Sequence, residues 1–169
     1  LDLIQKADCT PITIGELYGG GYLAPYSIYG YKTETRLAKD KDGNDIAGVN
    51  QRIPYKPGEA GALATPYWNP RINIVSATHI GKIYGGGYGA GATMIGSPYI
   101  NVNMEKGMIL EKYAKEKAGY SDLTVENGGV DAAGNQLLSI GTIGDIYGGG
   151  ELADVIGNTS VEIGTGRWI

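Results

Sequence analysis

The chain has 169 residues, a formal net charge of −4 and a sequence pI near 5.0, so it lacks the basic excess that nucleic-acid binding needs. It contains no run of eighteen apolar residues, so the sequence predicts no membrane-spanning helix. Its 29 glycines are far above average usage, and 13 tyrosines with no phenylalanine mean that every phenyl ring carries a hydroxyl.

The first predicted element is a strand that begins at residues 11–14 and runs into an octapeptide, Ile-Gly-Glu-Leu-Tyr-Gly-Gly-Gly, at residues 14–21. Near-identical octapeptides occupy residues 80–87 and 143–150. Each copy reads Ile-Gly, a charged residue, Ile or Leu, Tyr and three glycines. The chain is therefore internally repetitive, and the sequence predicts three equivalent structural units.

The octapeptide alternates in a way that predicts which side chains face solvent. Its third position carries a charge of either sign, which is typical of an exposed site, on Glu16, Lys82 and Asp145. Strand alternation then turns the next residues inward, and these are Leu17, Ile83 and Ile146. The tyrosines that follow point outward again, and these are Tyr18, Tyr84 and Tyr147. The glycine triplet indicates a tight corner. The tyrosine rings either pack over that corner or form an exposed line that stacks on sugars.

The chain after the first octapeptide is less regular. Residues 22–31 are rich in Tyr and Gly, and residues 32–37 alternate charge with Thr as a solvated strand does. Residues 38–50 predict a hairpin tip or a long loop. Four prolines within residues 51–70 prevent long regular structure there. We therefore expect an excursion from the main body over residues 38–70.

The second unit restarts with strand alternation at residues 71–75 and continues through its octapeptide. A second repeated element follows, because residues 95–103 align without gaps on residues 156–164, with apolar residues at the first, sixth and eighth places. The first unit offers only a loose match to this element at residues 29–37.

Residues 104–119 are rich in helix formers and predict one inserted helix. Glu111 and Lys115 form a favourable i,i+4 pair, and Gly119 is a plausible C-terminal stop. A polar return over residues 120–136 precedes the strand that leads into the third octapeptide.

These elements predict an all-β module with one inserted helix, spanning residues 1–169. Its three units cover about 11–37, 71–103 and 137–164, with excursions at about 38–70 and 104–136. Without the second excursion a unit has roughly 30 residues, which is typical of solenoid coils. One unit cannot bury its apolar face alone, but stacked units can. We expect a right-handed parallel β-solenoid, or β-helix, fragment of a longer protein. A β-sandwich with long hairpins is the alternative.

The third unit resembles a known repeat. Residues 143–164 read IGDIYGGGELADVIGNTSVEIG. This is similar to the "IG-x-VYGGG…ADV-x-GNT-x-V-x-I" repeats of large secreted or surface proteins of Gram-negative gut and oral anaerobes. The second unit departs from the pattern at residues 88–92 and 97–99, and the first keeps only the octapeptide. The resemblance implies a β-solenoid, adhesin-like stalk at the bacterial surface or secreted. It implies no catalytic residue.

Few residues predict chemistry. Asp145, Glu151 and Asp154 carry oxygen ligands that could gather around a cation, but a solvated acidic rim is the favoured interpretation. His79 is the sole histidine and has no catalytic partner in the pattern, and Cys9, the sole cysteine, cannot form an internal disulfide. We therefore expect no catalytic site, no metal site and no cofactor.

Three kinds of function stay open. The first is a structural or adhesive repeat module of a bacterial cell-surface or secreted protein, without catalysis, whose partners are glycans or surface proteins. The second is a carbohydrate-binding or carbohydrate-active β-helix, with a groove built from the loops and their aromatic residues. The third is a self-assembling extracellular filament subunit, because open strand edges pair readily. The candidate ligand-binding residues are aromatic: Tyr18, Tyr84, Tyr147, Tyr67 and Trp68.

Overall fold

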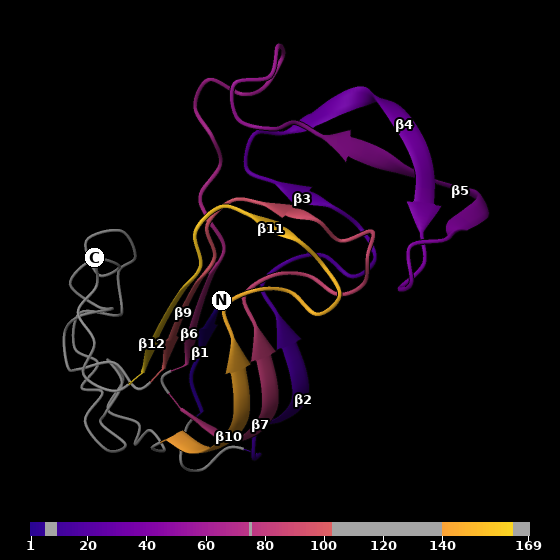
Figure 1. Ribbon diagram of the computed structural model, residues 1–169. Coiled ribbons are helices and arrows are strands. Elements are labelled where there is room, and N and C mark those ends of the chain that lie inside the picture. The colour runs from indigo at the N-terminus through magenta and orange to yellow at the C-terminus, as the bar shows by residue number, and fades with distance from the viewer. Residues whose placement is uncertain (6–9, 75, 103–139, 164–169) are drawn as a thin grey trace.

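The computed structural model describes residues 1–5, 10–74, 76–102 and 140–163 (Figure 1). Within these residues the chain is all-β and contains no helix. The strands are β1 Asp2–Leu3, β2 Thr13–Tyr18, β3 Tyr26–Ser27, β4 Tyr31–Lys39, β5 Asp45–Pro54, β6 Arg71–Ile74, β7 Ala77–Tyr84, β8 Met94–Ile95, β9 Tyr99–Val102, β10 Ile140–Tyr147, β11 Val155–Ile156 and β12 Ser160–Ile163. The helix expected at residues 104–119 and Cys9 lie outside the described residues.

The three octapeptides form one parallel sheet with strand order β10-β7-β2. They pair in exact register, so that Leu17 lies beside Ile83 and Ile83 lies beside Ile146. Figure 1 shows the three strands side by side. The predicted equivalence of the three copies is therefore confirmed.

The aliphatic residues of the octapeptides face a common core. Ile83 is 0% exposed and packs with Ile72, Ile74 and Ile100, while Leu17 and Ile146 are partly buried against the same cluster. The neighbouring charged residues lie toward solvent, and the Lys82 ammonium is 3.9 Å from the Glu16 carboxylate. The predicted alternation of interior and exterior residues is confirmed.

Two further parallel sheets complete the body. Their strand orders are β11-β8-β3 and β1-β6-β9-β12, and the second of these lies across the core from the octapeptide sheet (Figure 1). In both, each strand pairs with its counterpart in the next repeat, for example Val155 with Met94 and Val161 with Ile100. A repeat thus contributes one strand to each of three sheets.

β6 joins the sheet of β1, β9 and β12 and is separate from the octapeptide sheet. Ile72 pairs with Ile100 on one side, and Ile74 pairs with Leu3 on the other. β6 is therefore the counterpart of β1, which precedes the first octapeptide, and also of β9. The predicted unit at residues 71–103 thus contains two strands of this one sheet. The hairpin excursion lies between β3 and β6.

The expected strand at residues 32–37 does not stack on another repeat. It is part of β4, which pairs antiparallel with β5 and projects from the body as a hairpin (Figure 1). The match proposed for residues 29–37 is likewise wrong, because Tyr26 and Ser27 pair with Met94 and Ile95. Residues 51–54, expected to be irregular, belong to β5.

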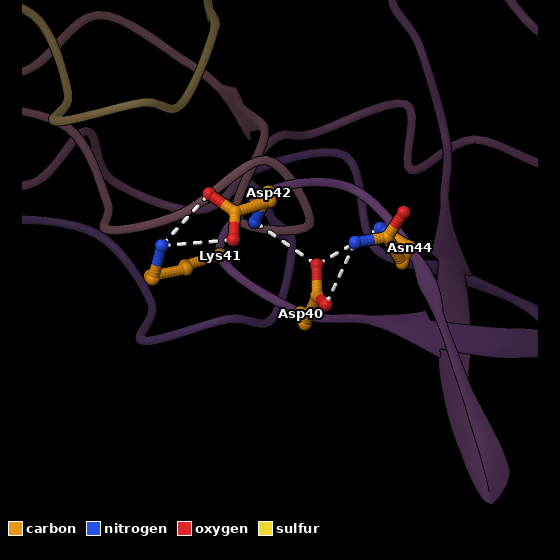
Figure 2. A network of polar contacts seen from close by, with 4 residues as sticks. All are labelled: Asp40, Lys41, Asp42 and Asn44. Carbon is orange, nitrogen blue, oxygen red and sulfur yellow. Dashed lines mark hydrogen bonds and ion pairs between the residues drawn. The ribbon is translucent and has the colours of Figure 1, made fainter.

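The hairpin tip is held by one carboxylate, as Figure 2 shows. The Asp40 Oδ1 accepts hydrogen bonds from the backbone N–H groups of Asp42 (2.9 Å) and Asn44 (2.8 Å), and Asn44 Nδ2 donates to Asp40 Oδ2 (3.0 Å). Gly43 has a φ of 93°, a left-handed conformation that suits glycine. These hydrogen bonds hold the pKa of the Asp40 carboxyl below its usual value, the Asn44 side chain being the main cause. The Asp-Lys-Asp-Gly-Asn run is therefore accounted for as a turn.

Asparagine side chains link neighbouring repeats within the β1-β6-β9-β12 sheet. The Asn101 Nδ2 donates to the Asn73 Oδ1 (2.9 Å), and the Asn73 Nδ2 donates to the Asp2 carboxylate (2.6 Å). Both asparagines are buried. Such a ladder satisfies polar groups only when the strands are in this register, so it favours the observed pairing.

Candidate functional site

The octapeptide tyrosines form a continuous stack on the outer side of their sheet. Their strands are in register, and parallel strands lie about 4.8 Å apart, so identical rings meet face to face. The ring centroids of Tyr18 and Tyr84 are 4.9 Å apart with an interplanar angle of 4°, and those of Tyr84 and Tyr147 are 4.9 Å apart at 12°. We call Tyr18, Tyr84 and Tyr147 the tyrosine ladder.

The stacking limits what the ladder can bind. Tyr84 is only 6% exposed because a neighbouring ring covers each of its faces, whereas Tyr147 at the end of the ladder is 46% exposed. The rings therefore pack mainly on one another. A sugar that stacks on an aromatic face would find such a face only at the end of the ladder.

A second row of rings lies next to the ladder and was missed in the sequence. Tyr22 and Tyr88 stack at 5.2 Å and 8°, and Tyr88 meets Tyr18 edge-on at 5.8 Å. Tyr22 and Tyr88 each follow a glycine triplet directly, and this shared position in the repeat could have revealed the pair. The third repeat has Glu151 at the equivalent place, bridged in parallel to Tyr88.

Glu151 brings a negative charge to the tyrosine ladder. The Tyr18 hydroxyl lies 2.5 Å from the Glu151 carboxylate and 2.9 Å from that of Glu16, and its one proton can be donated to either. Burial, followed by the hydrogen bond to Glu151, raises the pKa of Tyr18 well above its ordinary value. The same two causes raise the pKa of Tyr84. The hydroxyls of Tyr18 and Tyr84 thus stay protonated in alkaline solution.

We expect Glu151→Gln to lower the pKa of Tyr18, because the amide keeps an acceptor but removes the charge that opposes tyrosinate. An alkaline titration followed by tyrosinate absorbance measures this, with Tyr18→Phe identifying the contribution of Tyr18. Asp154→Asn is the control, since Asp154 is an exposed acid of the same loop. Identical titration curves for Glu151→Gln and the unchanged protein would refute the assignment.

The raised pKa values also set how stability depends on pH. A tyrosine whose pKa is higher in the folded than in the unfolded state contributes stability below its ordinary pKa of about 10, and this contribution is lost as the pH rises above that value. The free energy of unfolding should therefore fall above about pH 10, and less so in Tyr18→Phe.

Tyr67 and Trp68 lie apart from the tyrosine ladder, on the loop that returns from the hairpin. Both side chains are exposed, Tyr67 to 60%. The Arg71 guanidinium lies 5.9 Å from the centre of the Trp68 ring and 5.7 Å from that of Tyr99, distances typical of cation–π contacts. Among the described residues, ring contacts join Tyr18, Tyr84 and Tyr147 to one another and do not include Tyr67 or Trp68.

Tyr67 instead lines a pocket of about 360 Å³ at the base of the hairpin. The other lining residues are Tyr29, Gly30, Tyr31, Arg52, Tyr55, Gly61 and Leu63. Sequence reasoning missed all of them, although five of the chain's tyrosines fall within residues 22–31 and 55. The pocket brings four tyrosine side chains and one guanidinium together.

The residues considered for other chemistry have structural contacts. The His79 Nδ1 is 2.6 Å from the Thr142 hydroxyl of the adjacent repeat, in register with it. The Glu151 carboxylate accepts a hydrogen bond from the Tyr18 hydroxyl. Among the described residues, no group of three or more His, Cys, Asp or Glu side chains is arranged to hold a metal ion.

Comparison of the chain with protein-family models, with curated proteins and with solved structures found no match. In the part of the chain that the structure describes, no helix has the length and apolar character needed to cross a membrane.

Proposed function

We propose that the chain is a segment of a right-handed parallel β-solenoid and serves as a structural or adhesive module of a bacterial cell-surface or secreted protein, without catalysis. One observation carries this proposal: in each of the three sheets a strand pairs in register with its counterpart in the next repeat. Such a structure lengthens by one repeat without a change in cross-section. The surface location rests on the resemblance of residues 143–164.

The chemistry of the described surface favours a binding or structural role over a catalytic role. Tyr18, whose pKa is raised by burial and by the hydrogen bond to Glu151, is held protonated in a stack of rings, which opposes its use as a nucleophile or base. The stacked rings and the asparagine ladder both hold repeats at a constant spacing. Stiffness is what a surface stalk requires.

An adhesion assay tests the proposal. Beads coated with the chain should adhere to glycan-coated or cell surfaces, and the protein should release no reducing sugar from the glycans it binds. The control is the Ile83→Ala variant, which we expect to be destabilised, assayed above its unfolding midpoint. Sugar release that depends on the folded chain would contradict the proposal, and the absence of any adhesion would exclude the adhesive role and leave the structural one.

Exposed apolar residues of the third repeat favour self-association as a second candidate function. These exposed residues include Ile156, Val161 and Ile163. Ile163 is 64% exposed. The edge strands β10, β11 and β12 each have one pairing partner among the described strands. Electron microscopy of the bead-assay protein distinguishes the two, because filaments would identify an assembling subunit and single short rods a stalk segment.

A further inference from the structure

The tyrosine-lined pocket at the base of the hairpin has walls from three parts of the chain. Tyr29 precedes β4, and Tyr31 is the first residue of that strand. Arg52 lies on β5, and Tyr55 and Tyr67 lie on the loop that returns to the body. Its volume of about 360 Å³ falls within the range of small-molecule sites, about 300–1,000 Å³. The pocket is therefore large enough for one ring-sized ligand.

Backbone hydrogen bonds hold these walls in place without a ligand. The Tyr55 N–H donates to the Gly30 carbonyl (3.0 Å), and the Leu63 N–H donates to the Tyr29 carbonyl (2.9 Å). The Tyr67 N–H donates to the Ile28 carbonyl (2.7 Å). Since all three acceptors lie in one short segment after β3, the loop is tied directly to the body. A preformed pocket loses little entropy when it binds.

Gly61 shows how closely the pocket wall is packed. Its φ is 91°, and a Cβ there would lie 2.5 Å from the Tyr55 hydroxyl oxygen. A side chain at position 61 would thus displace Tyr55. The glycine leaves room for the tyrosine to line the pocket.

The four tyrosine hydroxyls of the pocket differ in their hydrogen bonding. The Tyr31 hydroxyl donates to the Pro25 carbonyl (3.1 Å). By contrast, the hydroxyls of Tyr29, Tyr55 and Tyr67 have no hydrogen-bond partner among the described residues. Three phenol groups, each able to donate and accept, are therefore available to a ligand with several hydroxyls.

Arg52 gives the pocket a positive charge. Its guanidinium lies 6.0 Å from the centre of the Tyr31 ring. It belongs to none of the ion pairs formed within the described residues, whereas the nearby Lys32 is paired with Glu59. The residues that line the pocket include no carboxylate. A planar guanidinium in this position is suited to bind a carboxylate through two hydrogen bonds.

We infer that this pocket binds a pyranose that carries a carboxylate, that is, a hexuronic acid unit of an acidic polysaccharide. The tyrosine rings can pack against the C–H faces of the sugar, the phenol groups can hydrogen-bond its hydroxyls, and Arg52 can bind its carboxylate. Glycoside hydrolysis ordinarily uses two carboxylic acids, which the pocket lining lacks, so the sugar is bound and released unchanged. The inference goes beyond the proposed structural role, because a stalk needs no such pocket.

Ligand-observed NMR titration of the full chain tests this inference. The probes are the methyl glycosides of galacturonic and glucuronic acid, each compared with its neutral counterpart, methyl galactoside or methyl glucoside. We expect the acidic sugars to bind at least about tenfold more tightly than the neutral ones, since a hydrogen bond to a charged group is worth more than a neutral one.

Two pairs of variants locate the binding. Arg52→Gln should remove the preference for the acidic sugars, and Arg36→Gln, a cation of the same hairpin outside this pocket, should keep it. Tyr67→Ala should weaken the binding of every sugar by about tenfold. Tyr22→Ala, which removes a ring that is 72% exposed elsewhere, should leave binding unchanged.

The outcomes that overturn the inference are distinct. Failure of the unchanged protein to bind any of the four sugars overturns it, and so does equal binding of acidic and neutral sugars. Loss of binding in a control variant would move the site elsewhere and overturn it as well. Circular dichroism of each variant verifies that the fold is retained. Adhesion of a folded chain that binds no uronic acid would leave the proposed function standing and this inference refuted.

Discussion

Gly86→Ala is expected to lower the free energy of unfolding by about 2–3 kcal/mol, the upper part of the range for overpacked interiors. A Cβ at this position would lie 2.7 Å from the Gly150 nitrogen and 2.8 Å from its Cα. Both are backbone atoms of the next repeat, which can move only if the sheets separate. Urea unfolding followed by circular dichroism measures the change.

Gly149→Ala is the matched control, because Gly149 is the equivalent glycine of the third repeat and a Cβ there would meet no atom within 4 Å. We expect it to be neutral or to stabilise the chain by about 0.4–1 kcal/mol through a less flexible unfolded state. Equal destabilisation by the two substitutions would show that the corner needs glycine for its backbone conformation and that stacking distance is not the cause.

Ile83→Ala is expected to cost about 2–5 kcal/mol, the range for truncating a fully buried aliphatic side chain. Ile83 is 0% exposed and lies between Leu17 and Ile146, so the cavity would open in the middle of the core with repeats on both sides. Thermal and urea unfolding both report the loss. The same measurements give the unfolding midpoint of Ile83→Ala, above which this variant serves as the unfolded control in the adhesion assay.

Ile163→Ala supplies the comparison for Ile83→Ala, since it removes the same atoms from a side chain that is largely exposed at the end of the stack. Its effect should stay within about 0.5 kcal/mol, as for most surface substitutions. If Ile163→Ala instead proves as damaging as Ile83→Ala, the third repeat is covered in solution, which would favour the filament subunit over the stalk segment.

The interior of the octapeptide sheet was predictable from local pattern. A position that is Glu in one copy, Lys in the next and Asp in the third must be solvated, and strand geometry then places Leu17, Ile83 and Ile146 inside. The structure confirms this, because the three side chains are in register and pack in one cluster.

The sheet that β6 joins was not predictable in the same way. The alternation of Ile72 and Ile74 is equally compatible with a strand that continues into the octapeptide and with a separate strand before it. Only the pairing of Ile72 with Ile100 and of Ile74 with Leu3 shows that β6 belongs to the sheet of β1 and β9. The hairpin between β3 and β6 obscures this in the sequence, because it interrupts the repeat there.

The charged alternation of β4 had a similar ambiguity. Side chains on the exposed face of a parallel sheet and on a projecting antiparallel hairpin have the same polar pattern, so residues 32–37 were placed in a stack that they do not join. The prolines of residues 51–70 predicted a break in regular structure, but residues 51–54 belong to β5.

The repeats by themselves determined that the octapeptide strands stack in register, because three copies with the same inside and outside pattern bury the same side chains only when aligned. They also determined that the ladder tyrosines occupy equivalent places. Only the tertiary structure decided that these rings cover one another, and that Tyr29, Arg52 and Tyr67 surround a pocket. The physical reason is that a repeat specifies its neighbour, whereas the hairpin occurs once and its contacts depend on how a unique loop folds back.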